Sequence, residues 1–148
     1  MDTADFDKVI ERYHTALGEL INGNPEVYKE LFSRRDDVTL ANPFAPFGPV
    51  SRGWAQVAET IERAAANYNG GEVVGFDIVA KYLTAELAYV VEVEHFKAKV
   101  GRRDDTASIT LRVTSILRRE DGVWMVVHRQ ADTITSPRQA EAVLGESH

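Results

Sequence analysis

The sequence predicts an α+β fold in which three N-terminal helices pack on a strongly curved antiparallel sheet of four long strands and one short strand. Apolar residues in the first half of the chain recur at the three- and four-residue spacing of helices. From Glu72 onward, runs rich in β-branched and aromatic residues are separated by turn residues, as in consecutive hairpins. Helices that precede the strands, rather than alternate with them, are typical of α+β proteins.

The helical pattern covers three segments. Residues 6–21 form a long amphipathic helix, with Tyr13 on its buried stripe. Asn24 is a suitable N-cap for a short helix over 25–32. A third helix covers 52–68 and ends before a glycine pair.

The strands are one short and four long. A short strand over 38–41 ends at Asn42, because the following proline cannot continue a ladder. The long strands are predicted at 73–83, 87–100, 106–119 and 123–134. Such strands would extend roughly 45 Å, more than the roughly 40 Å width of a globule of this size, so the sheet must bend. We expect its concave face to enclose a pocket.

A single domain accounts for residues 1–148. This length suits one domain, and a hydrophobic content of 44% supplies one core. No repeat, low-complexity tract or linker divides the chain. We expect the domain core at about 5–135 and a C-terminal tail at 136–148.

The composition argues against several kinds of site and partner. The chain has no cysteine and only four scattered histidines, so we expect neither a metal nor a cofactor. A net charge of −6 opposes sequence-independent binding to nucleic acid. No stretch approaches the roughly 18 apolar residues of a membrane span, and the N-terminus lacks the pattern of a signal peptide. We therefore expect a cytoplasmic protein that does not contact membranes or nucleic acid.

The turn at 120–122 decides which residues of the two strands that it joins lie on the same face of the sheet. We favour a three-residue turn with a left-handed Gly122 over a two-residue Asp121-Gly122 turn, which would reverse the pairing. The pocket face then contains Val90, Glu92, Glu94, Phe96, Arg112, Thr114, Ile116, Trp124, Val126, His128, Gln130 and Asp132.

The same turn predicts an apolar convex face. Its members are Ile109, Leu111, Val113, Leu117, Met125 and Val127, extended by Val91 and Val93. No helix remains to cover this face, and large exposed apolar patches mark association sites. We therefore predict a homodimer that forms through the convex face of the sheet.

Titratable side chains of the pocket face suggest acid–base chemistry. Glu92 and Glu94 would lie about 7 Å apart, close enough to raise one pKa in a dry cavity, with Arg112 as compensating charge. The alternative is a solvated face with an ordinary cross-strand ion pair. His128 titrates near neutral pH, and Glu92 or Asp132 could hold its tautomer, although a lone strand histidine is often structural. The other histidines receive no functional role.

Residues 111–132 resemble a segment of SnoaL-like proteins. They contain an Arg-x-Thr strand, a basic-acidic-Gly turn, a Trp, and a His-Arg-Gln-Ala-Asp ending in which Gln130 replaces the usual second histidine. With Tyr13 and Asn42-Pro43, the chain resembles the SnoaL-like and ketosteroid-isomerase-like families over about 5–135. The resemblance implies the cone-shaped nuclear transport factor two fold and a pocket. It implies no single reaction, because this fold hosts isomerases, cyclases, dehydratases and association domains.

Three positions can be compared with the ketosteroid isomerases. Tyr13 matches the oxyanion-hole tyrosine, and Thr114 lies near the second oxyanion donor. Asn42 stands where those enzymes have their general-base aspartate, and an amide takes up no proton at neutral pH. The comparison therefore argues against classical steroid isomerisation.

Two functions stay open from the sequence. The first is a cofactor-independent isomerase, cyclase or dehydratase that acts on an apolar carbonyl or hydroxyl compound. Its catalytic residues would be His128, Glu92, Glu94 and Asp132, and its substrate-binding residues Tyr13, Asn42, Arg112, Thr114, Trp124 and Gln130. The second is a ligand-binding or association domain without turnover, in which Arg112 could hold an anion.

Overall fold

A computed structural model of the chain describes residues 3–133, 140 and 144. The helices are α1 (Ala4–Leu20), α2 (Glu26–Glu30) and α3 (Trp54–Ala66). The strands are β1 (Thr39–Ala41), β2 (Ser51–Arg52), β3 (Tyr68–Leu83), β4 (Leu87–Val100), β5 (Ala107–Glu120) and β6 (Val123–Thr133). The predicted α+β class is confirmed, and β2 is an element that the sequence reasoning missed. The predicted tail at 136–148 lies outside the described residues except at 140 and 144.

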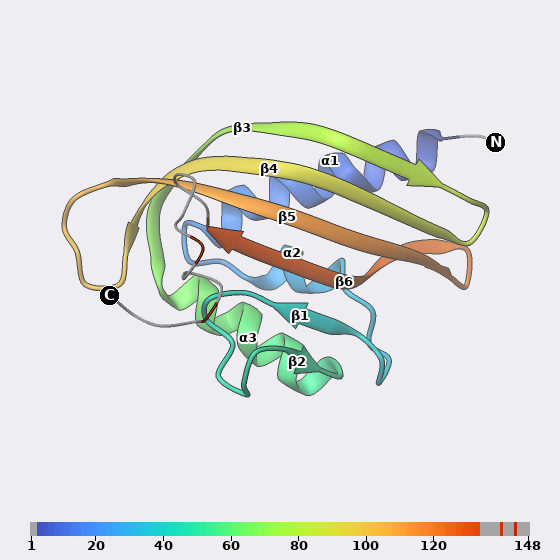
Figure 1. Cartoon of the computed structure of the whole chain (residues 1–148), viewed down its shortest axis with the longest axis horizontal. Coiled ribbons are helices and arrows are strands. Elements are labelled where there is room, and N and C mark those ends of the chain that lie inside the picture. Colours follow the sequence, from blue (N-terminus) through green and yellow to red (C-terminus); the bar gives the residue numbers. More distant parts are fainter. Residues whose placement is uncertain (1–2, 134–139, 141–143, 145–148) are drawn as a thin grey trace.

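The six strands form one sheet in the order β2-β1-β6-β5-β4-β3. Strands β3 to β6 are an antiparallel meander, whereas β1 pairs with β6 in parallel. Figure 1 shows the long strands curving across one side of the molecule, with β3 bending sharply after it leaves α3. Three register shifts in β3 mark β-bulges, which bend a strand and increase its twist.

The core lies between the inner face of this sheet, defined as the face toward the helices, and the apolar stripes of α1 and α3. Helix α1 buries Phe6, Tyr13 and Leu17 at the expected helical spacing. From β4, Val90 and Phe96 point into the same core with 1% exposure each. The sequence therefore placed both the helical stripe and the inner face of β4 correctly.

The turn between β5 and β6 has two residues, so the predicted three-residue turn is wrong. Glu120 pairs with Val123, which leaves Asp121 and Gly122 as the turn. Their φ angles of 51° and 81° are both positive, as a type I′ hairpin turn requires. This turn reverses the strand pairing that the sequence analysis favoured. Leu117 of β5 therefore faces inward, opposite Val126.

A β-bulge at Val127 then inverts the alternation of β6. Leu117 pairs with Val126 but Ile116 pairs with His128, so Val127 is one extra residue. Before the bulge, Trp124 and Val126 point inward. After it, the buried residues are Arg129 and Ala131, and His128, Gln130 and Asp132 lie on the outer face of the sheet.

The predicted apolar convex face is correct for Val91 and Val93 but wrong for its residues on β5. Leu111, Val113 and Leu117 belong to the core, because β5 presents them to the helices. The outer face instead contains residues that pair side by side across β3 to β6. These are Tyr82, Tyr89, Val91, Val93, Arg112, Thr114, Ile116, His128, Gln130 and Asp132.

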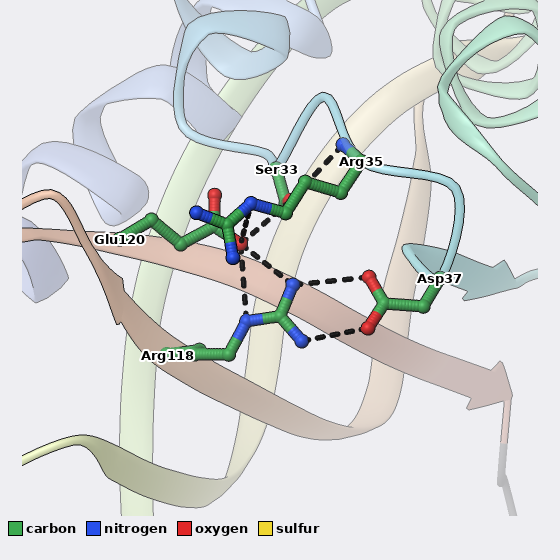
Figure 2. Close-up of polar contacts among 5 residues, drawn as sticks. All are labelled: Ser33, Arg35, Asp37, Arg118 and Glu120. Carbon is green, nitrogen blue, oxygen red and sulfur yellow. Dashed lines mark hydrogen bonds and ion pairs between the residues drawn. The ribbon is translucent and has the colours of Figure 1, made fainter.

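A polar cluster holds the end of β5 against the segment that joins α2 to β1. Arg118 donates two hydrogen bonds to Asp37, at 2.7 and 3.0 Å (Figure 2). Glu120 Oε2 accepts from Arg118 Nη2 at 2.6 Å and from the buried Ser33 hydroxyl at 2.8 Å. Arg35 Nε lies 3.7 Å from the same oxygen. These bonds join segments more than eighty residues apart.

Candidate functional site

A small cavity lies between the helices and the inner face of the sheet. Its free volume is about 30 Å³, room for about two water molecules. Most of its wall is aliphatic or aromatic, with contributions from Leu17, Leu20, Leu40, Pro43, Phe44, Ile61, Ala64, Phe96, Leu111 and Ala131. Four side chains add polar atoms: Tyr28, Asn42, Tyr68 and Arg129. The cavity is thus an apolar chamber with a few polar groups.

Asn42 lines this cavity. It follows β1 directly, and its Oδ1 accepts a hydrogen bond from the backbone N–H of Phe44 at 2.9 Å. Such a bond is typical of an Asx turn and fixes which end of the amide is oxygen. The Nδ2 amine has no partner among the described residues. Asn42 is therefore a lining residue whose amine has no acceptor among the described residues.

Aromatic rings surround Asn42 at this end of the cavity. Phe44 packs edge-on against Tyr68 with ring centroids 5.5 Å apart, and Tyr68 packs in the same way on Phe96. Burial raises the pKa of Tyr68 to about 12. The Tyr68 hydroxyl therefore stays protonated near neutral pH and can donate a hydrogen bond.

Arg129 lines the cavity and was missed by the sequence reasoning. It is 4% exposed, and its guanidinium binds both oxygens of Glu94 at 2.8 Å. Nη1 also donates to the Tyr13 hydroxyl at 2.8 Å, and that hydroxyl lies 2.9 Å from Ser115 Oγ. Burial opposes the charge, but Glu94 keeps the pKa of Arg129 well above its ordinary value. Arg129 is therefore a permanent cation at the cavity.

The hydrogen bonds of Arg129 also affect the ionisation of Tyr13 and occupy the carboxylate of Glu94. Burial raises the pKa of Tyr13, although Arg129 partly offsets the effect, so Tyr13 remains a neutral phenol. Tyr13 lies behind the wall rather than in it. Both oxygens of Glu94 accept from Arg129, which leaves no free carboxylate oxygen directed at a ligand.

Glu92 has a separate partner. Its carboxylate lies 3.0 and 3.1 Å from His14 Nε2, and the His14 ring stacks on Phe76 at 3.6 Å. The predicted inward direction of Glu92 is correct, since it is only 2% exposed. The predicted compensation by Arg112 is wrong, because Arg112 lies on the other face of the sheet. Neither member of the His14–Glu92 pair lines the cavity.

The other predicted catalytic residues lie on the outer face. His128 Nδ1 is 2.7 Å from Thr39 Oγ1, and partial burial lowers the pKa of His128. Asp132 accepts a hydrogen bond from Gln130 at 3.1 Å. The bulge at Val127 explains this displacement, because Trp124 and Val126 before it point inward as predicted. The sequence thus placed these three residues on the wrong side of the sheet.

Arg112 and Thr114 belong to the outer face as well. Arg112 is opposite Asp132 in the β5–β6 pairing but forms no ion pair or hydrogen bond among the described residues. A hollow of about 400 Å³ surrounds it, lined by Val79, Val91, Val93, Arg112, Thr114, Gln130 and Asp132, with parts of Glu92 and Val113. Trp124 lies in the core against Phe6, away from both sites.

The described residues bring together no cluster of three or more His, Asp or Glu side chains that could hold a metal ion. No helix within them is long and apolar enough to span a membrane.

Known proteins share this architecture. The chain is similar to a nuclear transport factor 2-like superfamily protein from Salmonella enterica serovar Typhimurium, with a TM-score of 0.73, 18% identity, and coverage of 94% of this chain and 95% of that one. The chain is also similar to a ketosteroid isomerase-like protein from Erwinia carotovora atroseptica, with a TM-score of 0.71 and 15% identity. The match covers 90% of this chain and 96% of that one. A search of curated proteins finds no match. At these identities the likeness shows the fold alone. A model of the SnoaL-like domain family matches residues 7–133, so the chain belongs to that family.

Proposed function

We propose that the chain binds a small, mainly apolar molecule in the inner cavity and donates a hydrogen bond from Asn42 to one oxygen of that molecule. The hydrogen bonding of the Asn42 amide supports this proposal. Its oxygen accepts from the Phe44 N–H, and its amine has no acceptor among the described residues. Tyr68 and Arg129 are further donors at the wall. The apolar lining would contact the body of the ligand.

The cavity must enlarge to admit such a ligand. Known small-molecule sites have volumes of roughly 300 to 1,000 Å³, well above the 30 Å³ available here. Asn42, Pro43 and Phe44 form the part of the wall that comes from a loop, and Phe47 of the same loop is 43% exposed. Moving the Phe44 ring away from Tyr68 breaks one aromatic contact and leaves the backbone pairing of β3 with β4 intact. We infer that the ligand enters by displacing the Phe44 ring while the Phe44 N–H keeps its bond to Asn42.

The positions of the acidic residues favour binding over proton transfer. Acid–base catalysis needs a group that can exchange a proton within hydrogen-bond reach of the substrate. Among the described residues, Glu94 is held by Arg129, and Glu92 pairs with His14 away from the cavity. His128 and Asp132 lie across the sheet. A donor-lined cavity can bind and polarise a carbonyl without turning it over.

The first prediction tests the Asn42 donor with two matched probes, acetophenone and ethylbenzene. Acetophenone should bind more tightly, because only its carbonyl can accept from Asn42. Asn42→Asp keeps the bond to the Phe44 N–H but removes the donor, and should weaken acetophenone binding about tenfold, the effect of one hydrogen bond. Calorimetric titration measures both affinities. Asn69→Asp changes an exposed amide in the same way and should leave binding unaltered; equal losses in both variants would reject the proposal.

We also propose that two copies of the chain associate through the outer face of the sheet. This face exposes Tyr82 by 59% and Tyr89 by 40%, and the two rings stack on each other. It also presents Arg112, which has no ion pair among the described residues, opposite Asp132. A two-fold arrangement can place each Arg112 against an acid of the other copy, which makes the face self-complementary.

The second prediction concerns this dimer. Light scattering coupled to size exclusion should give twice the mass of one chain. Tyr89→Glu places a charge in the apolar part of the face and should shift the protein toward one chain. Val50→Glu alters a residue of similar exposure in a loop and should not. A monomeric mass for the unmodified protein would contradict the proposal.

A further inference from the structure

Trp124 is buried but has an unused hydrogen-bond donor. Its side chain is 3% exposed, and Nε1 has no acceptor among the described residues. Phe6 packs edge-on against the indole at 5.4 Å, and the guanidinium of Arg119 lies 4.5 Å above it. An unsatisfied buried donor is destabilising and uncommon in native proteins. An acceptor supplied from outside the chain would remove that penalty.

Trp124 also forms part of the wall of a surface cleft. The cleft has a volume of about 270 Å³ and lies between the N-terminal half of α1 and the β5–β6 turn. Figure 1 shows these two segments at the same end of the molecule. Val9 and the 57% exposed Val123 make its remaining apolar wall. The volume is close to the lower end of known small-molecule sites, and none of its lining residues belongs to the inner cavity.

The charged residues of the cleft favour an anion. Lys8 is exposed and has no ion pair among the described residues. Arg12 bonds Glu30 through Nη2 at 2.8 Å, and its side chain is still 53% exposed. The one acid of the wall, Asp5, lies 4.0 Å from Arg119, which compensates it. Two cations therefore border a mainly apolar cleft, and the buried indole in its wall has a donor without an acceptor among the described residues.

We propose that this cleft is a second binding site and that it takes a small organic carboxylate. The apolar body of the ligand packs on Val9 and Val123, and the carboxylate lies among Lys8, Arg12 and the Trp124 N–H. A carboxylate has two oxygens and can accept from a neutral donor and a cation at once. An alcohol with the same hydrocarbon chain lacks the charge that Lys8 and Arg12 attract.

The test follows the indole N–H resonance of Trp124 by NMR, assigned from its loss in Trp124→Phe. Adding hexanoate should move this resonance in a saturable way, and 1-hexanol should bind more weakly. Lys8→Gln should weaken hexanoate binding about fivefold, the effect expected of one exposed ion pair. Lys99→Gln removes the same charge from an exposed position on β4 and should not change the affinity. Arg12→Gln provides a second variant of the cleft.

Three outcomes would overturn the proposal. One is a Trp124 resonance that hexanoate does not move. Another is hexanol binding as tightly as hexanoate, which would make the cleft an apolar site only. The third is an equal affinity for Lys8→Gln and Lys99→Gln, with Arg12→Gln also unchanged.

Discussion

At the scale of single residues, the buried pair of Arg129 and Glu94 organises the inner side of the sheet. Both side chains are at most 4% exposed, and they share two hydrogen bonds while Arg129 also binds Tyr13. Taking two charges out of water costs free energy, which the pair offsets only while both partners are present. The pair therefore makes the position of Arg129 at the cavity strongly dependent on Glu94.

The third prediction is that Arg129→Met destabilises the fold by about 3–5 kcal/mol, because it leaves the Glu94 carboxylate buried without a cation. Urea unfolding measures the change in the free energy of unfolding. Arg103→Met breaks an ion pair with Asp105 between two exposed side chains and should leave the unfolding midpoint unchanged. Similar effects of the two substitutions would show that the buried pair is not structural.

The fourth prediction concerns His128, whose pKa in the fold is lowered by burial. Above about pH 6.5 the imidazole is neutral in both the folded and the unfolded chain, so it makes no difference to stability. As the pH falls below about 6.5, the unfolded chain takes up the proton first and the folded state loses stability. The free energy of unfolding should therefore fall more steeply for the native protein than for His128→Gln. Parallel pH profiles for the two proteins would refute this role of burial.

At the scale of elements, two local features of the last hairpin explain most of the misplaced residues. Asp121-Gly122 is a strong signal for a two-residue turn, and the error lay in preferring a longer loop. The bulge at Val127 has no comparable signal, because Met125, Val126 and Val127 are all apolar and show no alternation. Inward and outward faces could therefore be predicted for β4 but not for the second half of β6.

The fifth prediction concerns the contact between the end of α1 and the start of β3. Asn22 binds both the N–H and the carbonyl of Gly71, at 3.0 and 2.9 Å. A Cβ at position 71 would lie 2.6 Å from the backbone oxygen of Ile21, so Gly71→Ala should cost about 1–3 kcal/mol through overpacking. Gly75→Ala is the control on the same strand, since its Cβ meets nothing within 4 Å. Thermal unfolding of both variants measures the difference, and equal midpoints would contradict the close approach.

At the scale of the whole molecule, the order and type of elements followed from periodicity and turn residues. The family resemblance stated from residues 111–132 is confirmed by the family match over 7–133. The site was predicted less well. Asn42 lies at the cavity because the end of β1 fixes it, whereas Arg129 was missed because the strand alternation that directed His128 into the pocket directed its neighbour Arg129 outward.

The observed positions of the titratable side chains explain why the functional hypothesis changes from proton transfer to binding. The sequence predicted that His128, Asp132, Glu92 and Glu94 line one pocket, and this arrangement favoured proton transfer. The sheet separates them into an outer group and two inner pairs, each inner carboxylate with its own partner. The cavity that remains is lined by donors and apolar groups.

The most direct measurement is a crystal structure of the protein soaked with 4-bromoacetophenone, located by the anomalous signal of bromine. We predict that the bromine lies inside the fold between α1, α3 and the sheet, with the carbonyl oxygen within hydrogen-bond distance of Asn42 Nδ2 and Phe44 moved away from Tyr68. Bromine found only in the outer hollow beside Arg112, with the inner cavity unchanged, would contradict the account.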